Sequence, residues 1–443
     1  MVLEEQTVTM DKIVALAKRR GFAYGSSDLY GGLSGFWDYG PLGVELKRNI
    51  KDLWWRAMVS NREDVVGLDA AIITHPAVLA ASGHVDNFND PLVECADCRR
   101  RFRDDDIERP GVCPACGGKL STPRQFNTMF RTEVGPVAED ASLAYLRPET
   151  AQGTFVNFKN ILQTTNQKVP FGIAQVGKSF RNEITTGNFI FRSREFEQME
   201  MEFFVKPGSD DEWFQFWRNQ RMQWWTHDLG IRTENIQLRD HQAAELSHYS
   251  KQTSDVEYRY PFGWKELEGI ADRTDFDLKA HIAGSGVDLS YFDDQTQERY
   301  VPYVIEPAVG VERTFLVAMV DAYAEEQLGE KPSDRRTILR FKPRVAPYKV
   351  AVFPLVSNKP HIVEKARSIY LALKPHFRVA WDDIGNVGKR YRRQDEIGTP
   401  WAITVDYQTL EDGTVTVRDR DTMEQPRYPV DDLAPMFREW LES

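Results

Sequence analysis

The sequence predicts an α+β domain built on an antiparallel sheet, followed by a small C-terminal α/β domain with a mixed sheet. Two segments, Ile173 to Glu183 and Arg194 to Val205, alternate apolar and polar residues with the period of a strand. A third strand-like run, Tyr300 to Ile305, leads into an amphipathic helix, roughly Val311 to Glu325. Beyond about Arg336, short strand and helix patterns alternate, which is typical of a small α/β domain.

Length and composition indicate a globular protein with more than one domain. The chain has 443 residues, of which 41% are hydrophobic and 28% charged. No apolar run is long enough to span a bilayer, and the N-terminus lacks the apolar stretch of a secretory signal, so we expect a cytoplasmic protein without a membrane partner. The net charge of −11 argues against non-specific coating of the protein by nucleic acid, but it does not exclude RNA binding at a local basic patch.

The first part of the chain, residues 1–340, is expected to form the larger domain. It begins with a helix-like segment, Val44 to Met58, and a strand-like run, Asp64 to Thr74, that ends near Pro76. A small cysteine-containing insertion follows at about residues 93–120.

The four cysteines of the chain lie in this insertion, as Cys95-x-x-Cys98 and Cys113-x-x-Cys116. This spacing is close to that of a four-cysteine zinc ribbon. Two disulfides or four free thiols are the alternatives, and disulfides are disfavoured in a cytosolic chain. We expect a structural zinc ion, because four thiolates complete a tetrahedral shell and leave no position for catalysis.

The alternating segments are expected to expose a polar face. In Ile173 to Glu183 the positions of Ala174, Val176 and Phe180 are apolar, whereas the intervening ones are mostly polar. We therefore expect antiparallel strands with one buried apolar face and one polar working face. The alternative is a sheet whose polar face is simply solvated.

Two motifs predict the chemistry of that face. The first, Phe180-Arg181-Asn182-Glu183, is followed by the string from Arg192 to Glu200, and the second runs from Glu306 to Arg313. Together they provide fixed arginines for phosphate oxygens and clustered carboxylates for a cation, which suits a nucleoside triphosphate beside a small ammonium-bearing substrate. A tight turn at Gly310 would open the helix, whose N-terminus favours anions. The alternative for Gly-x-Glu-Arg alone is a salt bridge at a helix N-terminus.

The C-terminal part, residues 347–443, follows a Pro- and Arg-containing linker. Strand-like and helical runs alternate there, and the basic run from Lys389 to Arg393 is the best candidate for nucleic-acid contact. The alternative is a solvated basic helix face.

With these residues in view, nearly the whole chain resembles the class II aminoacyl-tRNA synthetases, specifically the homodimeric glycyl-tRNA synthetases. Further strings that support the resemblance are Asp38 to Gly43, Ser82 to Asp86, Arg147 to Gln152 and Asp395 to Pro400. The segment that ends at Pro76 resembles the first motif of the class, the Phe180 string the second and the Gly310 string the third. The resemblance implies a class II catalytic fold, an anticodon-binding domain, activation of glycine with ATP and Mg²⁺, transfer to tRNA(Gly), and a homodimer.

The resemblance also implies roles for individual residues. Arg181 would contact the α-phosphate and Arg313 the γ-phosphate of ATP, Phe196 would stack on adenine, and Glu266 would help to position Mg²⁺. The full set implied for ATP is Arg181, Asn182, Glu183, Phe191, Arg192, Ser193, Arg194, Glu195, Phe196, Glu266, Leu267, Gly310, Val311, Glu312 and Arg313. The set implied for glycine is Arg101, Glu149, Phe196, Glu197, Gln198, Met199, Glu200, Glu306, Pro307, Ala308, Val309 and Gly310.

One position departs from the family pattern. The family usually has Glu-Pro-Ser before the third motif, and its serine touches glycine, whereas this chain has Ala308. This departure keeps open the alternative of a class II ligase for another small amino acid. The second alternative is a catalytically silent, synthetase-like RNA-binding paralogue, although such proteins usually lose the motif arginines and this chain has both Arg181 and Arg313.

Overall fold

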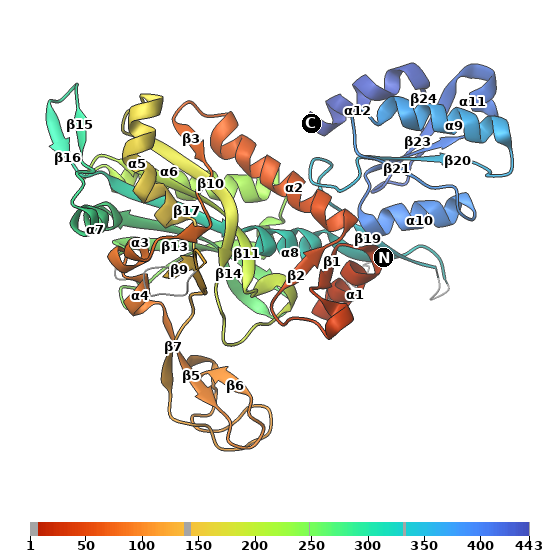
Figure 1. The fold of residues 1–443 in the computed structure, drawn as a ribbon. Helices are drawn as coiled ribbons and strands as arrows, with labels where there is room; N and C mark the ends of the chain where they lie inside the picture. Colours follow the sequence, from red (N-terminus) through yellow and green to blue (C-terminus); the bar gives the residue numbers. More distant parts are fainter. Residues whose placement is uncertain (1–7, 137–142, 248, 331–333, 443) are drawn as a thin grey trace.

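The computed structural model describes residues 8–136, 143–247, 249–330 and 334–442, and shows a two-lobed molecule with a small projecting module (Figure 1). The predicted fold class is confirmed: the large lobe is an α+β domain on a mainly antiparallel sheet, and the C-terminal lobe has a mixed sheet. Residues 1–7, which the expectation about the N-terminus concerns, lie outside the described range. Among the described residues no helix combines the length and apolar character needed to cross a membrane.

The large lobe is organised around a seven-stranded sheet with the order β12-β13-β14-β17-β11-β10-β3. All neighbours are antiparallel except β10 and β3, which are parallel. The strands are β3 (Val65–Leu68), β10 (Phe171–Phe180), β11 (Glu195–Val205), β12 (Ile236–Asp240), β13 (Gln252–Tyr260), β14 (Gly263–Thr274) and β17 (Tyr303–Gly310).

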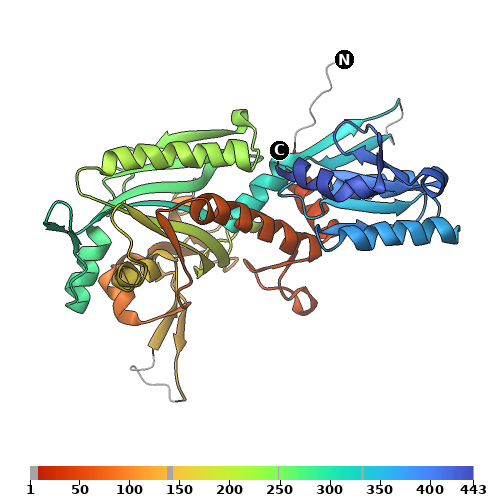
Figure 2. The ribbon, with the colours of Figure 1, turned by 90° about the horizontal axis from the view of Figure 1, so that it is seen from above.

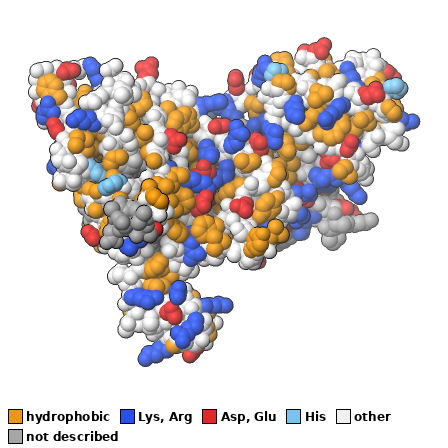
Figure 3. All heavy atoms as spheres, viewed as in Figure 1, with side chains coloured by type: hydrophobic (Ala, Val, Ile, Leu, Met, Phe, Trp, Pro, Cys, Tyr) orange, Lys and Arg blue, Asp and Glu red, His pale blue; other side chains and the backbone are white. Residues whose placement is uncertain are grey.

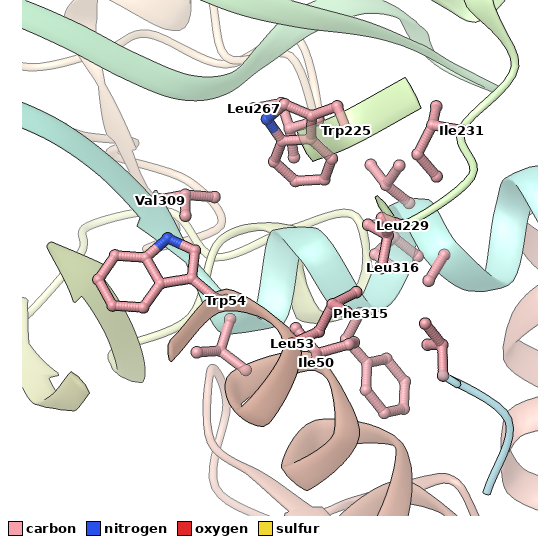
Figure 4. Packing of buried hydrophobic residues seen from close by; sticks show 14 of the residues in the cluster. Ile50, Leu53, Trp54, Trp225, Leu229, Ile231, Leu267, Val309, Phe315 and Leu316 are labelled. Carbon is pink, nitrogen blue, oxygen red and sulfur yellow. The ribbon is translucent and has the colours of Figure 1, made fainter. Parts of the chain in front are cut away.

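Helices cover both faces of this sheet. On one face lie α2 (Pro41–Trp55), α6 (Asp210–Gln223) and α8 (Val311–Ala322), whose apolar side chains form the largest core cluster with the sheet. In Figure 4, Trp54 of α2 and Phe315 and Leu316 of α8 meet Leu267 and Val309 of the sheet. On the other face lie α5 (Ala151–Thr165) and α7 (Phe276–Ser285), as the view from above in Figure 2 shows for α5 and α6. Burial of these apolar faces is the main force that holds the layers together.

The polar face of β11 is not simply solvated, so the alternative of a solvated sheet face is wrong for this strand. From Gln198 onward every residue of β11 is buried, including Glu200 and Glu202. The apolar positions Met199, Met201 and Phe203 pack in the large cluster, as predicted. The polar positions are covered because α5, α7 and the segments around them close over that face.

Several elements differ in extent from the predictions. The helix expected at Val44 to Met58 is α2 followed by a π turn, Arg56–Ser60, and the strand expected at Asp64 to Thr74 divides into β3 and the short β4 (Ile73–Thr74). The helix α8 ends at Ala322, and β18 (Tyr323–Gln327) follows it directly. The strand expected at Tyr300 to Ile305 lies further along the chain, where β17 begins at Tyr303 and ends at Gly310.

The remaining elements of the large lobe are short. They are α1 (Met10–Arg20), β1 (Ala23–Gly25), β2 (Trp37–Tyr39), α3 (Pro76–Ala81), α4 (His84–Asn87), β8 (Arg131–Glu133), β9 (Leu143–Leu146), β15 (Tyr291–Asp293), β16 (Glu298–Tyr300) and β19 (Arg335–Leu339). The projecting module contains β5 (Asn89–Glu94), β6 (Arg101–Arg103) and β7 (Arg124–Asn127). Further 3-10 and π turns occur at Asp28–Tyr30, Asp104–Asp106, Phe189–Phe191, Trp224–Asp228, Thr233–Asn235 and Val430–Asp432.

The C-terminal lobe has a five-stranded mixed sheet with the order β21-β20-β22-β23-β24. Its central strand pairs are parallel and its later ones antiparallel. The elements are β20 (Val350–Pro354), α9 (Pro360–Leu373), β21 (Val379–Trp381), α10 (Val387–Ile397), β22 (Trp401–Val405), α11 (Tyr407–Asp412), β23 (Thr414–Asp419), β24 (Arg427–Pro429) and α12 (Leu433–Glu442).

The segment expected to be a linker is packed against the large lobe. Val345 and Ala346 belong to the core cluster of that lobe, and the Asn49 amide of α2 donates hydrogen bonds to both of their carbonyls, at 3.0 and 2.9 Å. Arg336 of β19 is buried and reaches across to α10, where its Nη1 lies 3.3 Å from Asp395. The two lobes are therefore joined by packed and charged contacts rather than by a free tether.

Candidate active site

A cavity of about 530 Å³ opens on the face of the central sheet formed by β11, β14 and β17. Of the residues predicted for ATP or glycine, those that line it are Glu149, Arg181, Glu183, Phe191, Arg192, Ser193, Phe196, Gln198, Glu200, Glu266, Leu267, Glu306, Ala308, Val309, Gly310, Glu312 and Arg313. Segments more than 100 residues apart in the sequence thus meet at one site, because antiparallel pairing sets β11 beside β17 and β17 beside β14.

Arg181 stands at the end of β10, where the strand leaves the sheet. Its Nε donates to the Pro148 carbonyl at 3.0 Å, and its guanidinium lies 5.3 Å from the centre of the Phe88 ring and 5.5 Å from that of Phe196. Contacts on both sides hold the cation in place. The side chain of Arg194 supports the same turn, since its Nε and Nη2 donate to the Glu183 carbonyl at 3.1 and 2.8 Å.

Arg313 stands on the first turn of α8, as expected. Its guanidinium lies 4.5 Å from the centre of the Phe191 ring, and its Nη1 is 3.3 Å from the half-exposed carboxylate of Glu266. The charge of Arg313 lowers the pKa of Glu266, so this carboxylate stays ionised beside the guanidinium. The chain passes directly from β17 to α8 at Gly310, whose φ of −77° is a conformation that any residue adopts, so this junction does not require a glycine.

A lysine that the motif analysis missed links the two motifs. Lys47 of α2 is buried and contacts Glu197 at 2.5 Å and Glu312 at 2.7 Å. Glu312 in turn accepts a hydrogen bond from the backbone N–H of Glu197 at 2.8 Å. Although burial alone would raise the pKa of Glu197, Lys47 and Lys51 lower it to about 2. The carboxylates of Glu197 and Glu312 are therefore held by α2, and they brace β11 against α8.

Three carboxylates that influence one another, those of Glu149, Glu200 and Glu306, also line the cavity. Glu200 accepts a hydrogen bond from the backbone N–H of Thr150 at 3.0 Å and another from its hydroxyl. Burial, and then the nearby Glu149, raise the pKa of Glu200 to about 7. Burial also raises the pKa of Glu306, whose carboxylate accepts a hydrogen bond from Arg273 at 2.9 Å. Because like charges crowd one another here, a cation bound among them would relieve repulsion.

Arg273 and His84 balance part of this charge, and neither was predicted. Arg273 is buried and donates to Asp277 at 2.7 and 2.9 Å besides Glu306. His84 lies 3.4 Å from Glu149. Burial would raise the pKa of Glu149, but His84 and then Arg273 outweigh it and lower the pKa. The sequence signals these two residues only indirectly: a predicted cluster of buried carboxylates indicates that some cation lies nearby, because buried carboxylates need one.

Eight predicted residues do not line the cavity. Met199 and Val311 pack in the core. Pro307 is buried between Glu306 and Ala308, which line the cavity, because successive residues of a strand face opposite sides. Glu195 pairs with Lys178 at 2.6 Å. Arg194 stabilises the motif through its hydrogen bonds to the Glu183 carbonyl, and Glu197 through its contact with Lys47. The backbone N–H of Asn182 donates to the Thr128 carbonyl. Arg101 is exposed on β6 and pairs with Glu94 at 3.0 Å, whereas Arg103 lines the cavity.

Other lining residues were also missed by sequence reasoning. They are Asn87, Phe88, Asn89, Asp90, Arg103, Thr128, Ile190, His241, Ser247, Tyr249, Thr253, Asp255, Gly269 and Ala271. Most belong to loops or to β13 and β14, outside the motif strings, so no local pattern marks them.

The four cysteines converge in the projecting module. Their sulfur atoms all lie within 4.8 Å of one another, with 3.5 Å between Cys95 and Cys116 and 3.7 Å between Cys98 and Cys113. A disulfide needs sulfur atoms about 2.05 Å apart, so these pairs are free thiols. A tetrahedral zinc ion with bonds of about 2.3 Å places its sulfur ligands about 3.8 Å apart, which these separations fit.

The basic run of α10 is largely used inside the lobe. Arg390 is buried and donates to the carbonyls of Pro354, Asp383 and Gly385. Arg393 pairs with Asp382 at 2.7 and 2.8 Å. Lys389 is exposed, and Tyr391, Arg392 and Arg393 are half-buried. A simply solvated basic face therefore does not describe this helix, and RNA contact through its exposed part stays a prediction. Figure 3 shows Lys and Arg side chains elsewhere, notably on the projecting module and between the lobes.

Comparison with known proteins agrees with this geometry. Residues 130–323 match the family described as tRNA synthetase class II core domain (G, H, P, S and T), and residues 349–440 match the anticodon binding domain. The chain is 53% identical to a glycine--tRNA ligase of Thermobifida fusca, over 98% of each chain. It is 53% identical to one of Streptomyces coelicolor, over 96% of each, and 52% identical to one of Treponema denticola, over 100% of this chain and 99% of the other.

Proposed function

Because the chain belongs to the glycine--tRNA ligase family of class II synthetases, we propose that this cavity binds ATP and glycine side by side and joins them as glycyl-adenylate. The enzyme is an aminoacyl-tRNA ligase that couples glycine to tRNA(Gly), and members of the class use ATP with Mg²⁺. The residue roles below are proposals. The observation that supports them best is that the fixed guanidiniums of Arg181 and Arg313 line the same cavity as three carboxylates, those of Glu149, Glu200 and Glu306.

In the proposed reaction the glycine carboxylate attacks the α-phosphorus of ATP, and pyrophosphate leaves in line. Arg181 would neutralise charge at the α-phosphate and Arg313 at the γ-phosphate, so that catalysis rests on positioning and electrostatics. Mg²⁺, when bound, adds charge neutralisation at the phosphates, and Glu266 is the candidate ligand. Its pairing with Arg313 would have to rearrange when ATP binds. A terminal ribose hydroxyl of tRNA then attacks the adenylate carbonyl.

Glycine would be recognised by its ammonium group. Glu149, Glu200 and Glu306 supply acceptors for it, and the buried setting makes each charged hydrogen bond strong. Ala308 lines the same cavity, where its methyl group replaces the hydroxyl that the family usually presents. Larger amino acids would be excluded by crowding, which a pocket does more easily than excluding smaller ones.

The test of this function is amino-acid-dependent exchange of pyrophosphate into ATP, run with each standard amino acid, together with charging of tRNA(Gly). We expect exchange with glycine alone. Exchange that depends on alanine or serine instead would favour the ligase for another small amino acid. No exchange with any amino acid, with tRNA binding intact, would favour the silent paralogue.

We propose that Cys95, Cys98, Cys113 and Cys116 hold one structural zinc ion. The fit of their separations to a tetrahedral shell supports this proposal. Cys95, Cys98 and Cys113 pack with Val93 and Leu120 in the small apolar centre of the module, and Cys116 is exposed beside them, so the ion would replace a core that the module is too small to build.

We expect one zinc per chain in the purified enzyme, and less than half of that in Cys113→Ser, because the site loses a buried ligand. Metal analysis by mass spectrometry measures this. Ser121→Ala, in the same module, is the matched control and should keep its zinc. The assignment fails if Cys113→Ser retains the full metal content. We expect glycine-dependent exchange to fall less than tRNA charging in this variant, because the module projects from the cavity-bearing lobe.

We further propose a cytoplasmic homodimer that binds tRNA(Gly) with the C-terminal lobe as anticodon reader. The segment that ends at Pro76 resembles the motif that builds class II dimers, and it presents the exposed side chains of Ile72 and Ile73. Exposed aliphatic pairs of this kind suit a subunit contact. Analytical ultracentrifugation should give twice the chain mass of 51.0 kDa. A single-chain mass at micromolar concentration would refute the dimer.

A further inference from the structure

The proposed recognition of the glycine ammonium uses three glutamates and leaves a neighbouring one, Glu202, unexplained. Glu202 of β11 is 0% exposed, and neither of its carboxylate oxygens has a hydrogen-bond partner among the described residues. Burying an ionised carboxylate without partners costs several kcal/mol, whereas the protonated acid avoids most of that cost. The burial of Glu202 therefore calls for either a proton or a cation close by.

The strand register shows what faces Glu202. In the antiparallel pair of β11 and β17, Phe203 pairs with Ile305 and Glu200 with Ala308. The same register sets Glu202 opposite Glu306, on the face that bears the cavity. Directly opposed residues have Cβ atoms about 4.5–5.5 Å apart, so two glutamate side chains can reach each other.

The surroundings of Glu202 are apolar on the side away from the cavity. On β10 its cross-strand partner is Ile173, which lies with Phe204 in the apolar cluster on α5 and α7. Burial, and then Glu306 and Glu200, raise the pKa of Glu202 well above its ordinary value. The charged groups that face the pair from the neighbouring elements are Glu200 on β11, Arg273 on β14, Glu149 before α5, and Asp277 on α7.

Only one of these groups is a cation, and it is already engaged. Arg273 donates to Glu306 and to Asp277, so its charge is shared between two carboxylates. A second ionised carboxylate opposite Glu306 would be repelled by it and would have no cation of its own. A proton between the two carboxyl groups removes this repulsion and gives Glu202 a hydrogen-bond partner.

We propose that Glu202 is a protonated carboxylic acid that donates a hydrogen bond to the Glu306 carboxylate, and that it thereby positions Glu306 for the substrate ammonium. The proposal rests on the proposed function of the cavity. Glu202 is a positioning residue, since it lies behind Glu306 and acts through it. Arg273 holds one oxygen of Glu306 and Glu202 would fix the other side of the group, so that its charge stays directed toward the cavity.

Two isosteric variants determine which member of the pair holds the proton. Glu202→Leu removes the hydrogen-bond donor and should raise the glycine KM by about tenfold, whereas Glu202→Gln keeps a neutral donor and should hold the glycine KM and kcat of exchange within about threefold of wild type. Glu306→Gln removes the charge that meets the ammonium, so the glycine KM should rise by about 10- to 100-fold. In the infrared spectrum at pH 8, the band of a protonated buried carboxyl should be lost in Glu202→Gln and retained in Glu306→Gln.

Several results would overturn the proposal. A glycine KM in Glu202→Gln raised as much as in Glu306→Gln would show that Glu202 is ionised. If Glu306→Gln kept the wild-type glycine KM while Glu202→Gln raised it, the proton would lie on Glu306. Titration of the wild-type infrared band needs no variant, and its absence at pH 8 would also refute a neutral Glu202. If wild-type enzyme lacked glycine-dependent exchange, the proposed function would fail, while the infrared measurement would still report on Glu202.

Discussion

Arg181→Ala and Arg313→Ala should each lower glycine-dependent exchange of pyrophosphate into ATP by at least about 10²-fold, the scale of losing one preorganised charge donor. Both guanidiniums line the cavity and are held by aromatic rings on its wall, Phe88 and Phe196 for Arg181 and Phe191 for Arg313. Because the rings hold both side chains in place before ATP arrives, their charge is available to the transition state once Glu266 has released Arg313.

The measurement is the rate of exchange at saturating glycine and ATP, with folding checked by circular dichroism. Arg299→Ala is the matched control, since Arg299 is 60% exposed and pairs with Asp288 away from the cavity. It should leave the rate unchanged. Arg313→Lys should restore only part of the loss, because an ammonium group lacks the forked donors of a guanidinium. Near wild-type exchange in either alanine variant would remove that arginine from the mechanism.

Lys47→Met should destabilise the large lobe by about 3–5 kcal/mol, the usual effect of leaving buried carboxylates without their cation. Lys47 contacts both Glu197 and Glu312, and all three are largely buried. Exchange should also fall by at least about tenfold, since β11 and α8 would lose the contact that aligns the two motifs. The midpoint of urea unfolding, followed by tryptophan fluorescence, measures the stability change.

The pH dependence of this effect has a definite sign. Lys47 and Lys51 lower the pKa of Glu197 to about 2, so the stability they provide is complete above the ordinary carboxyl pKa and is lost as the pH falls toward 2. The gap between wild type and Lys47→Met should therefore be constant from pH 6 to 8 and narrow in acid. Lys206→Met is the control, because Lys206 and Glu298 form an exposed ion pair, and such pairs contribute only about 0–1 kcal/mol to stability. Equal shifts in the two variants would disprove the bracing role.

The sequence identified the elements that hold the site, since β10, β11 and α8 follow directly from apolar periodicity. It did not show how the polar face of β11 is enclosed, because a period of two separates the faces of a strand but does not reveal that a helix layer covers one of them. Lys47 and Arg273 were missed for a different reason. Their partners lie 265 and 33 residues away along the chain, and such pairings follow from the assembled fold alone.

The fold of the C-terminal lobe was predicted from the sequence, but the internal contacts of its arginines were not. The Lys389 to Arg393 run has the composition of an RNA-binding helix, but Arg390 and Arg393 bond within the lobe, so reversing the charge of Arg393 would disturb folding as well as RNA binding. Truncation near residue 340 would similarly strip Val345 and Ala346 from the core of the large lobe and leave Arg336 without Asp395. Lys389 is the better position for testing RNA contact.

The packed junction between the lobes also bears on how a long RNA is handled. If the C-terminal lobe swung on a flexible tether, each binding event would have to bring two independently moving parts into register, with a loss of conformational entropy. Here Val345, Ala346 and the contact of Arg336 with Asp395 set the spacing of the lobes when the chain folds. If the C-terminal lobe reads the anticodon, as proposed, this spacing sets the length over which an RNA must extend from that lobe to the cavity.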